Sequence, residues 1–509
     1  MKKSLSVLLL VCTILIGGAA VADEVPFDDE DRRVIQIIDL AVSLGQQYHD
    51  SIWPGYNLNE IPLILYRTDI YALLVNAPET VEGFLPYPSN WPVLPTAVQY
   101  YPGQYQDLVG QLSFDYAIND FKATAVAYDK QSLLYFVKFL IHENFHQFQR
   151  DNFGEIPWAR EELYPIEDAA NLALASVEVQ LLRDIIHRTQ ISSPEDIRPL
   201  VAEFVALRNY HWQTAPAYVA RYEQGQEINE GTAKYVEMKG VSFLSRLKNA
   251  DNFELPEDSL DFAQALIDNF DYILAGGVVE IEHLSRNRIY PVGASEGYLA
   301  DMFNADWKSR AQKAGEEFRF DKILADAINY DSTKSESYLA KTLSNYNYHL
   351  LLSRASKKIE VYKNSFDSVQ AEFEGQPGRK IIFKLSGRNL SRSRESIAKK
   401  WIIDNGAKEL RDHYKIYFLK RTDNVKLSFQ LKESGLLEMT NWKNRDKSLQ
   451  FFCQNLESLE LDGSRCEPEN NLEQQFSTLK ITGNNFELET AKPGLLTITE
   501  NLISIDLLQ

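Results

Sequence analysis

The sequence predicts an α+β fold with a helical middle and a β-rich C-terminal part. Short strand-like runs come first, between about residues 61 and 128, and long stretches with apolar residues at helical spacing follow. From about residue 356, alternating patterns such as 425–431 replace the helical spacing. A chain of 509 residues with 44% apolar residues is long enough for two or three packed domains.

The first 22 residues have the three parts of a secretory signal. Lys2 and Lys3 form a basic start, residues 5–16 form an apolar stretch, and residues 20–22 (Ala-Val-Ala) form a small-residue cleavage site. The apolar stretch is shorter than the roughly 20 residues that a membrane span needs. We therefore expect a signal peptide over 1–22, no stable membrane span, and a mature protein that is periplasmic or secreted.

The segments before the first motif predict one amphipathic helix and an open sheet. Apolar residues at helical spacing predict the helix over about 28–48. Short apolar runs bounded by polar residues predict strands at 61–66, 70–75, 111–117 and 121–128.

The middle of the chain is predicted to be helical over about 131–149, 165–187, 194–212, 218–249, 259–285 and 295–353. Pro291 and Gly293 interrupt the pattern, so segment 287–293 is predicted to be a loop. We expect one domain over 23–355 and a separate β-rich domain over 356–509.

The net charge of the chain argues against some classes of binding partner. A formal net charge of −19 argues against nucleic acid and anionic membrane surfaces as main partners, because both attract clustered Lys and Arg.

Without the signal, only two cysteines remain, Cys453 and Cys466. An even pair of cysteines in an oxidising compartment predicts a disulfide, with two free thiols as the alternative.

The motif His142-Glu143-Asn144-Phe145-His146 lies inside the helix predicted over 131–149. Residues four apart share one face of a helix, so both imidazoles can bind one metal ion with Glu143 beside them. Zinc suits two imidazoles and one carboxylate, and it lowers the pKa of its bound water so that a nearby carboxylate can take the proton. The alternative is a partly buried histidine pair satisfied by hydrogen bonds.

A third zinc ligand has to come from elsewhere in the chain. Glu227, Glu230 and Glu237 are expected on one face of a downstream helix, and Gly231 leaves room for another helix to approach closely. The alternative is a solvent-exposed acidic stripe. Glu178, within an apolar helical run, is a further candidate as a ligand or supporting carboxylate, although such a residue more often pairs with an arginine.

The order His-Glu-x-x-His followed by residues 229–233 (Asn-Glu-Gly-Thr-Ala) resembles the gluzincin branch of the zinc metallopeptidases. The phrase over 142–149, with its aromatic residues, also resembles the peptidase-MA-like secreted proteins of bacteria. This resemblance implies a zincin-like mixed sheet and a helical catalytic domain over 23–355, with zinc as the cofactor and a peptide or protein as the substrate.

The same resemblance implies that His142, His146 and Glu230 are the zinc ligands and that Glu143 is the general base. His146 and Glu230 are 84 positions apart (230 − 146), and a helical hairpin inserted over 165–212 would account for this separation.

Lys234 stands where thermolysin-like enzymes carry an acidic residue that orients a zinc-bound histidine. Glu237 or Glu227 is expected to take that role instead. The resemblance also implies a tyrosine that donates a hydrogen bond to the tetrahedral oxyanion, and Tyr290, 60 positions after Glu230 (290 − 230), is the candidate. His283 is an alternative for this task, and core packing is the ordinary role of such a tyrosine.

These features predict an exported zinc metallopeptidase whose strand over 121–128 pairs with an extended substrate. One alternative keeps the zinc site in a non-catalytic binding or scaffold protein that recognises its partners through the β-rich residues 356–509. Another is hydrolysis of an ester or epoxide, because the same metal site can activate water toward such bonds.

Overall fold

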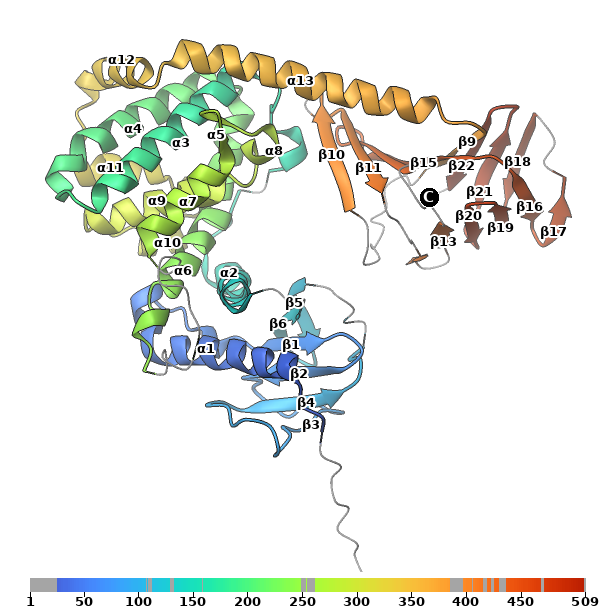
Figure 1. The fold of residues 1–509 in the computed structure, drawn as a ribbon, viewed down its shortest axis with the longest axis horizontal. Helices are drawn as coiled ribbons and strands as arrows, with labels where there is room; N and C mark the ends of the chain where they lie inside the picture. Colours follow the sequence, from blue (N-terminus) through green and yellow to red (C-terminus); the bar gives the residue numbers. More distant parts are fainter. Residues whose placement is uncertain are drawn as a thin grey trace, which may run out of the picture.

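The structure is a computed structural model (Figure 1). It describes residues 25–106, 108, 112–128, 132–157, 159–248, 253, 261–384, 397–404, 406–414, 419–422, 425–429, 436–467 and 471–507. The predicted signal peptide lies outside the described residues. Mixed sheets, a helical middle and a β-rich C-terminal part confirm the predicted α+β class.

The N-terminal part is a sheet covered by two helices, α1 (Asp29–Ile52) and α2 (Leu133–Asn152). Asp28 caps α1 in a reciprocal capping box with Asp31, which satisfies free N–H groups at the helix start. The sheet has the order β3-β4-β2-β1-β6-β5. Its strands are β1 (Leu63–Arg67), β2 (Tyr71–Val75), β3 (Leu85–Pro86), β4 (Val98–Pro102), β5 (Leu112–Ile118) and β6 (Phe121–Ala127).

The four predicted strands are present, and β3 and β4 were not predicted. The expectation that strand 121–128 pairs with a substrate is wrong, because β6 already pairs with β1 on one side and with β5 on the other. Its backbone groups are therefore used within the sheet. The edge strand on this side is β5.

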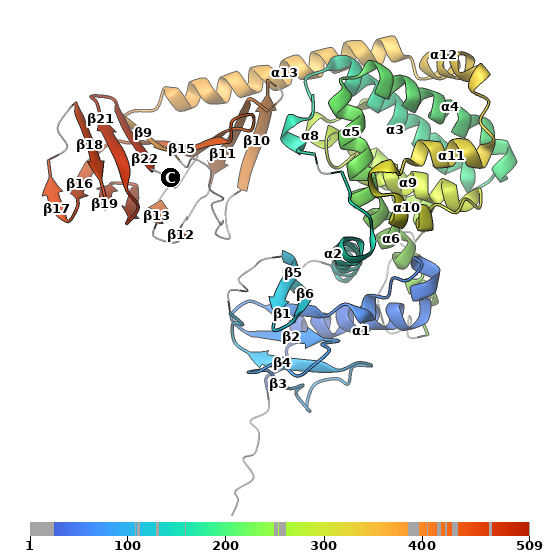
Figure 2. The same ribbon diagram turned by 180° about the vertical axis from the view of Figure 1, so that it is seen from behind.

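The helical part packs above α2 (Figures 1 and 2). Its main helices are α3 (Ala169–Thr189), α4 (Pro194–Thr214), α5 (Ala217–Gln226), α6 (Thr232–Val241), α7 (Phe262–Ile273), α8 (Ile281–Leu284), α9 (Ile289–Met302), α10 (Lys308–Ala314), α11 (Phe320–Ile328), α12 (Ser335–Asn345) and α13 (Tyr348–Glu374). Short elements are η1 (Leu58–Glu60), η2 (Glu161–Leu163), the π-helical turn η3 (Glu227–Gly231), η4 (Leu244–Arg246), β7 (Leu274–Ala275), β8 (Val278–Val279), η7 (Gly315–Glu317) and η8 (Ser332–Lys334). Helices α3 and α4 pack together as the expected helical hairpin between the two motifs.

Two expectations about the middle of the chain are wrong. The stretch 218–249 is not one helix, since the π-helical turn η3 separates α5 from α6. Segment 287–293 is not a loop, because α9 begins at Ile289. Pro291 is tolerated there since the first four N–H groups of a helix have no partner within it.

The β-rich part follows the long helix α13, which carries the chain away from the helical part (Figures 1 and 2). Its first strand starts at Arg379, later than the expected change near residue 356, because α13 continues the helical spacing to Glu374. One sheet has the order β10-β11-β14-β15-β9-β22-β21-β18 and the other β12-β13-β20-β19-β16-β17. Apolar side chains between them form a separate core that includes Ile381, Leu459 and Ile505.

The strands of the β-rich part are β9 (Arg379–Lys384), β10 (Ile397–Ile403), β11 (Lys408–Tyr414), β12 (Leu419–Thr422), β13 (Val425–Phe429), β14 (Leu436–Asn441), β15 (Asp446–Cys453), β16 (Leu456–Leu461), β17 (Ser464–Cys466), β18 (Leu472–Phe476), β19 (Leu479–Gly483), β20 (Phe486–Thr490), β21 (Gly494–Ile498) and β22 (Leu502–Leu507). Trp401, Ile402 and Leu410, from β10 and β11, belong to the core of the helical part. The β-rich part is thus joined to the helices by packing as well as by α13.

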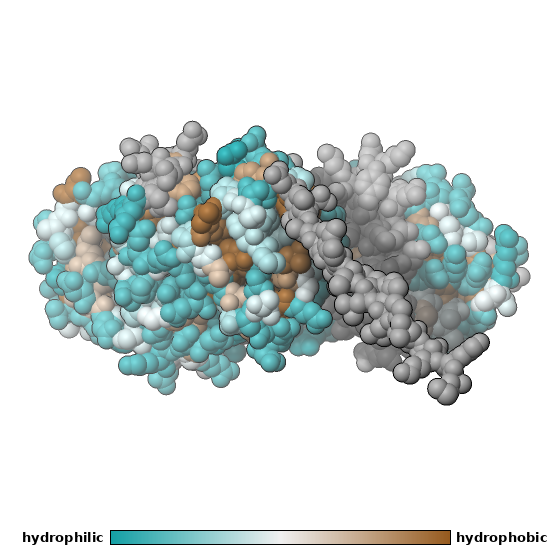
Figure 3. All heavy atoms as spheres, turned by 90° about the horizontal axis from the view of Figure 1, so that it is seen from below, coloured by the Kyte–Doolittle hydropathy of each residue, from teal (hydrophilic) through white to brown (hydrophobic). Residues whose placement is uncertain are grey.

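Cys453 and Cys466 are free thiols, so the predicted disulfide is not formed in the structure. Cys453 lies on β15 in one sheet and Cys466 on β17 in the other. Among the residues that are coloured in Figure 3, most of those on this face are hydrophilic, and hydrophobic residues form smaller areas among them. Within the described residues, no helix combines the length and apolar character needed to cross a membrane.

Candidate metal centre

Helix α2 presents His142 and His146 on one face, as the four-residue spacing predicts. Ser132 caps the helix by accepting a hydrogen bond from the backbone N–H of Tyr135, and no Pro or Gly interrupts the helix before its end at Asn152. The two imidazole ring centroids lie 4.8 Å apart. Both side chains are largely shielded from solvent, with exposed fractions of 8% and 12%.

Glu230, on the π-helical turn η3, lies next to both histidines. Its Oε2 lies 3.2 Å from Nε2 of His142 and 3.3 Å from Nε2 of His146. One ligand atom from each of the three residues lies within 4.8 Å of the others. The structure therefore brings together the three residues that the sequence predicted as metal ligands.

The residue types of the cluster and the two distances from Glu230 are compatible with a zinc site. Structural and catalytic zinc sites use imidazole nitrogens and carboxylate oxygens about 2.0–2.2 Å from the ion, which places neighbouring ligands of a tetrahedron roughly 3.3–3.5 Å apart. The distances from Glu230 to the two imidazoles already match the edge of such a tetrahedron.

In the absence of a metal ion, the histidines and carboxylates of the cluster shift one another's pKa values. Burial alone would lower the pKa of His142, but the carboxylates of Glu230 and Glu237 outweigh burial and raise this pKa to about 9. Burial would raise the pKa of Glu230, but the two histidines hold it well below its usual range. A proton shared by imidazole and carboxylate supplies the positive charge that a metal ion would replace.

Glu237 lies behind His142, at the position where an orienting carboxylate is expected. Its Oε2 is 3.3 Å from Nδ1 of His142, and Lys234 donates a hydrogen bond of 2.6 Å to its other oxygen. Burial would raise the pKa of Glu237, but Lys234 and His142 lower it to about 2. Glu237 thus stays ionised and directs Nε2 of His142 toward Glu230.

Glu227 does not take part in the metal cluster, and the expectation that Glu227, Glu230 and Glu237 share one helical face is wrong. The π-helical turn η3 covers Glu227–Gly231, so its wider turn changes the direction of the side chains that it carries. Glu227 points to Arg208, whose Nη1 is 2.5 Å from Glu227 Oε1, while Glu230 points to the histidines.

Gly231 makes a close approach, as expected, but its neighbour is α9 and not α2. A Cβ atom at Gly231 would lie 2.8 Å from Cα of Gly293. This Gly–Gly contact lets α9 pack directly on the turn that carries Glu230. The start of α9, with Tyr290, is thereby held beside the metal ligands.

Tyr290 stacks on His142, with ring centroids 5.6 Å apart and 13° between the ring planes. Burial and the nearby carboxylate of Glu230 raise the pKa of Tyr290, so its hydroxyl keeps its proton. His283 is not brought to the cluster. Its Nδ1 bonds to Asn287 at 2.7 Å, and its ring packs on Tyr272.

A cleft of about 530 Å³ opens beside the cluster. Helix α2 lines it with Glu143, His146, Gln149 and Arg150, and segment 156–162 adds Ile156, Ala159, Glu161 and Glu162. The other lining residues are Tyr222 and Gln226 on α5, Asn229 and Glu230 on η3, Arg286, and Tyr290 on α9. Burial raises the pKa of Glu143, although His142 and His146 counteract this. A carboxylate with a raised pKa is suited to accept and return a proton.

Sequence reasoning missed Arg286 and Gln149 as cleft residues. Arg286 lies over the ring of Tyr290, 6.0 Å from its centroid, and 3.5 Å from Glu161. Nothing in the local pattern around Arg286 marks it. Gln149 follows His146 by three residues on the same helix, and this spacing was the available signal.

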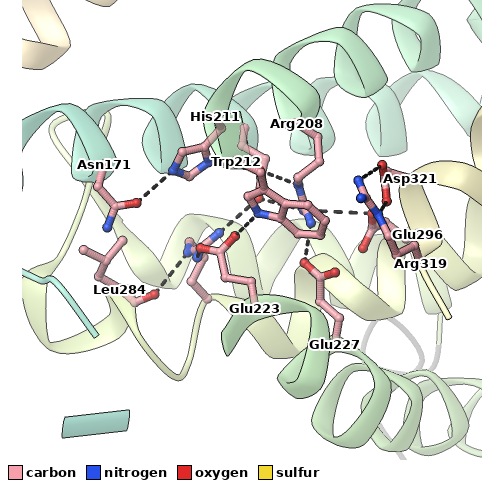
Figure 4. Close-up of polar contacts among 12 residues, drawn as sticks. Asn171, Arg208, His211, Trp212, Glu223, Glu227, Leu284, Glu296, Arg319 and Asp321 are labelled. Carbon is pink, nitrogen blue, oxygen red and sulfur yellow. Dashed lines mark hydrogen bonds and ion pairs between the residues drawn. The ribbon is translucent and has the colours of Figure 1, made fainter. Parts of the chain in front are cut away.

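A second cluster of charged residues is buried among the helices α3, α4, α5, α9 and the turn η3 (Figure 4). We call it the arginine cluster, and it consists of Glu178, Arg208, Glu223, Glu227, Arg288 and Glu296. Arg208 bonds to both oxygens of Glu178 at 2.8 and 3.0 Å, and Arg288 bonds to Glu178 at 3.0 Å. Glu178 is therefore neither a metal ligand nor in contact with one, and its pairing with arginine is the alternative that the sequence left open.

No family model, curated protein or solved structure matches the chain. The assignment of a function therefore depends on the geometry of the site.

Proposed function

We propose that the chain is an exported, zinc-dependent peptidase with His142, His146 and Glu230 as its metal ligands. The observation that carries this proposal is the convergence of the Nε2 atoms of His142 and His146 on one oxygen of Glu230, beside a cleft that His146 and Glu230 line. The three-ligand set leaves a fourth position for water or a substrate carbonyl, as in catalytic zinc sites. When bound, zinc supplies Lewis acidity and lowers the pKa of that water.

Glu143 has the role of general base in this proposal. It lines the cleft beside His146, and its raised pKa places it closer to the working range of a group that takes a proton from water and returns it to the leaving amine. The hydroxyl of Tyr290 has the role of oxyanion donor, because it stays protonated and lies at the same wall.

The edge strand β5 replaces β6 as the candidate for pairing with an extended substrate. It belongs to the sheet beneath α2 and, among the strands that the structure describes, is the last in the order of that sheet. Export is proposed from the sequence of the first 22 residues.

The test is cleavage of a broad peptide library by the zinc-loaded mature protein and by Glu143→Gln. We expect cleavage by the wild type and a loss of about 100-fold or more in Glu143→Gln at unchanged zinc content, since general bases contribute roughly 10²–10⁴-fold. Glu195→Gln, at the exposed start of α4, is the control and keeps full activity. A zinc-loaded wild type that cleaves no peptide, or equal cleavage by Glu143→Gln, contradicts the proposal.

A further inference from the structure

Gln149 contacts both His146 and the turn that carries Glu230. It follows His146 by three residues on α2, and 2% of its surface is exposed. Its Oε1 lies 2.6 Å from Nδ1 of His146. Its amide nitrogen lies 2.7 Å from the carbonyl oxygen of Asn229 and 3.2 Å from that of Ile228, both in the turn that carries Glu230.

The π-helical turn changes the backbone hydrogen bonds around these carbonyls, since the N–H of Thr232 is directed at the carbonyls of Glu227 and Asn229 and not at that of Ile228. In an α-helix the carbonyl of residue 228 would accept the N–H of residue 232, but a π-turn shifts the partner by one residue and disturbs the hydrogen bonds at its ends. Gln149 donates to Oγ1 of Thr232 at 2.7 Å, and Thr232 donates to the carbonyl of Ile228 at 2.6 Å. The turn is therefore held by side chains that reach it from α2 and α6.

The contacts of Gln149 also fix which end of its amide faces His146. Backbone carbonyls only accept hydrogen bonds, so the NH2 group has to face Ile228 and Asn229, and the amide oxygen has to face the imidazole. An oxygen accepts a hydrogen bond, so Nδ1 of His146 carries the proton. The free electron pair of His146 is then on Nε2, which faces Glu230.

We propose that Gln149 is a positioning residue that sets the tautomer of His146 and anchors the π-helical turn, and so holds the metal ligands His146 and Glu230 in one arrangement. This inference rests on the proposed zinc site. It gives Nδ1 of His146 a buried oxygen neighbour, as Oε2 of Glu237 lies 3.3 Å from Nδ1 of His142.

Gln147 offers a matched control on the same helix. It is the same residue type, two positions earlier, with 6% of its surface exposed. Its amide nitrogen donates to the carbonyl of Lys122 at 3.2 Å, and Oγ1 of Thr124 lies 3.4 Å from its oxygen, so it faces the sheet and not the metal cluster.

The experiment measures zinc affinity by competition with a chelator for the wild type, Gln149→Met, Gln149→Glu and Gln147→Met. It also records the visible absorption spectrum of the cobalt-substituted proteins, which reports ligand geometry. We expect zinc affinity to fall about 10–100-fold in Gln149→Met, as for other residues that orient metal ligands, with an altered cobalt spectrum. Gln149→Glu keeps the acceptor for His146 but loses both donors, so its affinity lies between those of wild type and Gln149→Met. Gln147→Met stays within about twofold of wild type.

Thr232→Val gives an independent check that does not change Gln149. If Gln149 acts through the turn, Gln149→Met and Thr232→Val together weaken zinc binding little more than Gln149→Met alone, because the two residues share one set of hydrogen bonds. Circular dichroism confirms that each metal-free variant is folded before zinc is added.

Zinc affinity and a cobalt spectrum in Gln149→Met equal to those of the wild type, or an equal loss in Gln147→Met, overturn the inference while the zinc site stands. A folded wild type that binds no zinc overturns both the inference and the proposed function.

Discussion

Two clusters of carboxylates share the π-helical turn, and they differ in what balances their charge. Glu227 points into the arginine cluster, where Arg208 and Arg288 supply two permanent positive charges. Glu230 points to two imidazoles, which bring no permanent charge. In the arginine cluster the chain itself supplies the cations, whereas under the proposed function a metal ion supplies the positive charge beside Glu230.

The arginine cluster contains more carboxyl groups than guanidinium groups, so some of its carboxyl groups are expected to be protonated. Burial would raise the pKa of Glu178, but Arg208, His211 and Arg288 lower it to about 2, so it is ionised. Burial raises the pKa of Glu296 well above its usual range. Among the described residues, neither oxygen of Glu296 has a hydrogen-bond partner, which is consistent with a neutral acid.

The largest effect is expected from Arg208→Met. Removal of this guanidinium leaves Glu178 and Glu227 buried without their main cation, and breaking a buried ion pair on one side typically costs about 3–5 kcal/mol. The free energy of unfolding in urea measures this loss on metal-free protein. Arg221→Met, an exposed position on α5, is the control and changes it by less than about 0.5 kcal/mol. A loss below about 1 kcal/mol in Arg208→Met would show that the cluster does not depend on Arg208.

Acid is expected to weaken the arginine cluster through Glu178. Its pKa is about 2 in the folded protein and close to the ordinary 4.5 in the unfolded chain, so the unfolded state binds more protons in between. Its stabilisation is complete above about pH 4.5 and is lost as the pH falls toward 2, with a total of about 3 kcal/mol. Urea unfolding across this range measures the slope, which Glu178→Gln should reduce. An unchanged slope in the variant contradicts the assigned pKa.

In the metal cluster the corresponding change is Glu237→Gln, and its effect is expected on zinc and not on folding. The amide is nearly the same size but a weaker acceptor for Nδ1 of His142, so zinc affinity falls about 10–100-fold. Chelator competition measures the change. Equal zinc affinity in wild type and variant would show that Glu237 does not support zinc binding through His142.

The smallest effect is expected from Glu296→Gln. If Glu296 is a neutral acid, an amide of similar shape replaces it at a cost below about 1 kcal/mol, unlike the loss of a charged partner. Urea unfolding at pH 7 measures this. A loss of more than about 2 kcal/mol would show that Glu296 is an ionised member of the cluster.

Local periodicity in the sequence predicted which residues of the metal cluster share a helix face. It could not predict the features that depend on contacts between residues far apart in the chain. The four-residue spacing placed His142 and His146 on one face, because that geometry is internal to a helix. The direction of Glu227 was mispredicted because a π-turn is not visible in a hydrophobic pattern. The sequence suggested that Glu178 could pair with an arginine but did not show which one. Its partners Arg208 and Arg288 lie 30 and 110 positions away in the chain.

The most direct test of the central claim is the zinc content of the purified mature protein after reconstitution, compared between wild type, His142→Ala and Glu178→Gln. The account predicts one zinc per chain in the wild type and in folded Glu178→Gln, and none in His142→Ala. A folded wild type without zinc, or a His142→Ala variant that retains it, would contradict the assignment of this cluster as the metal centre.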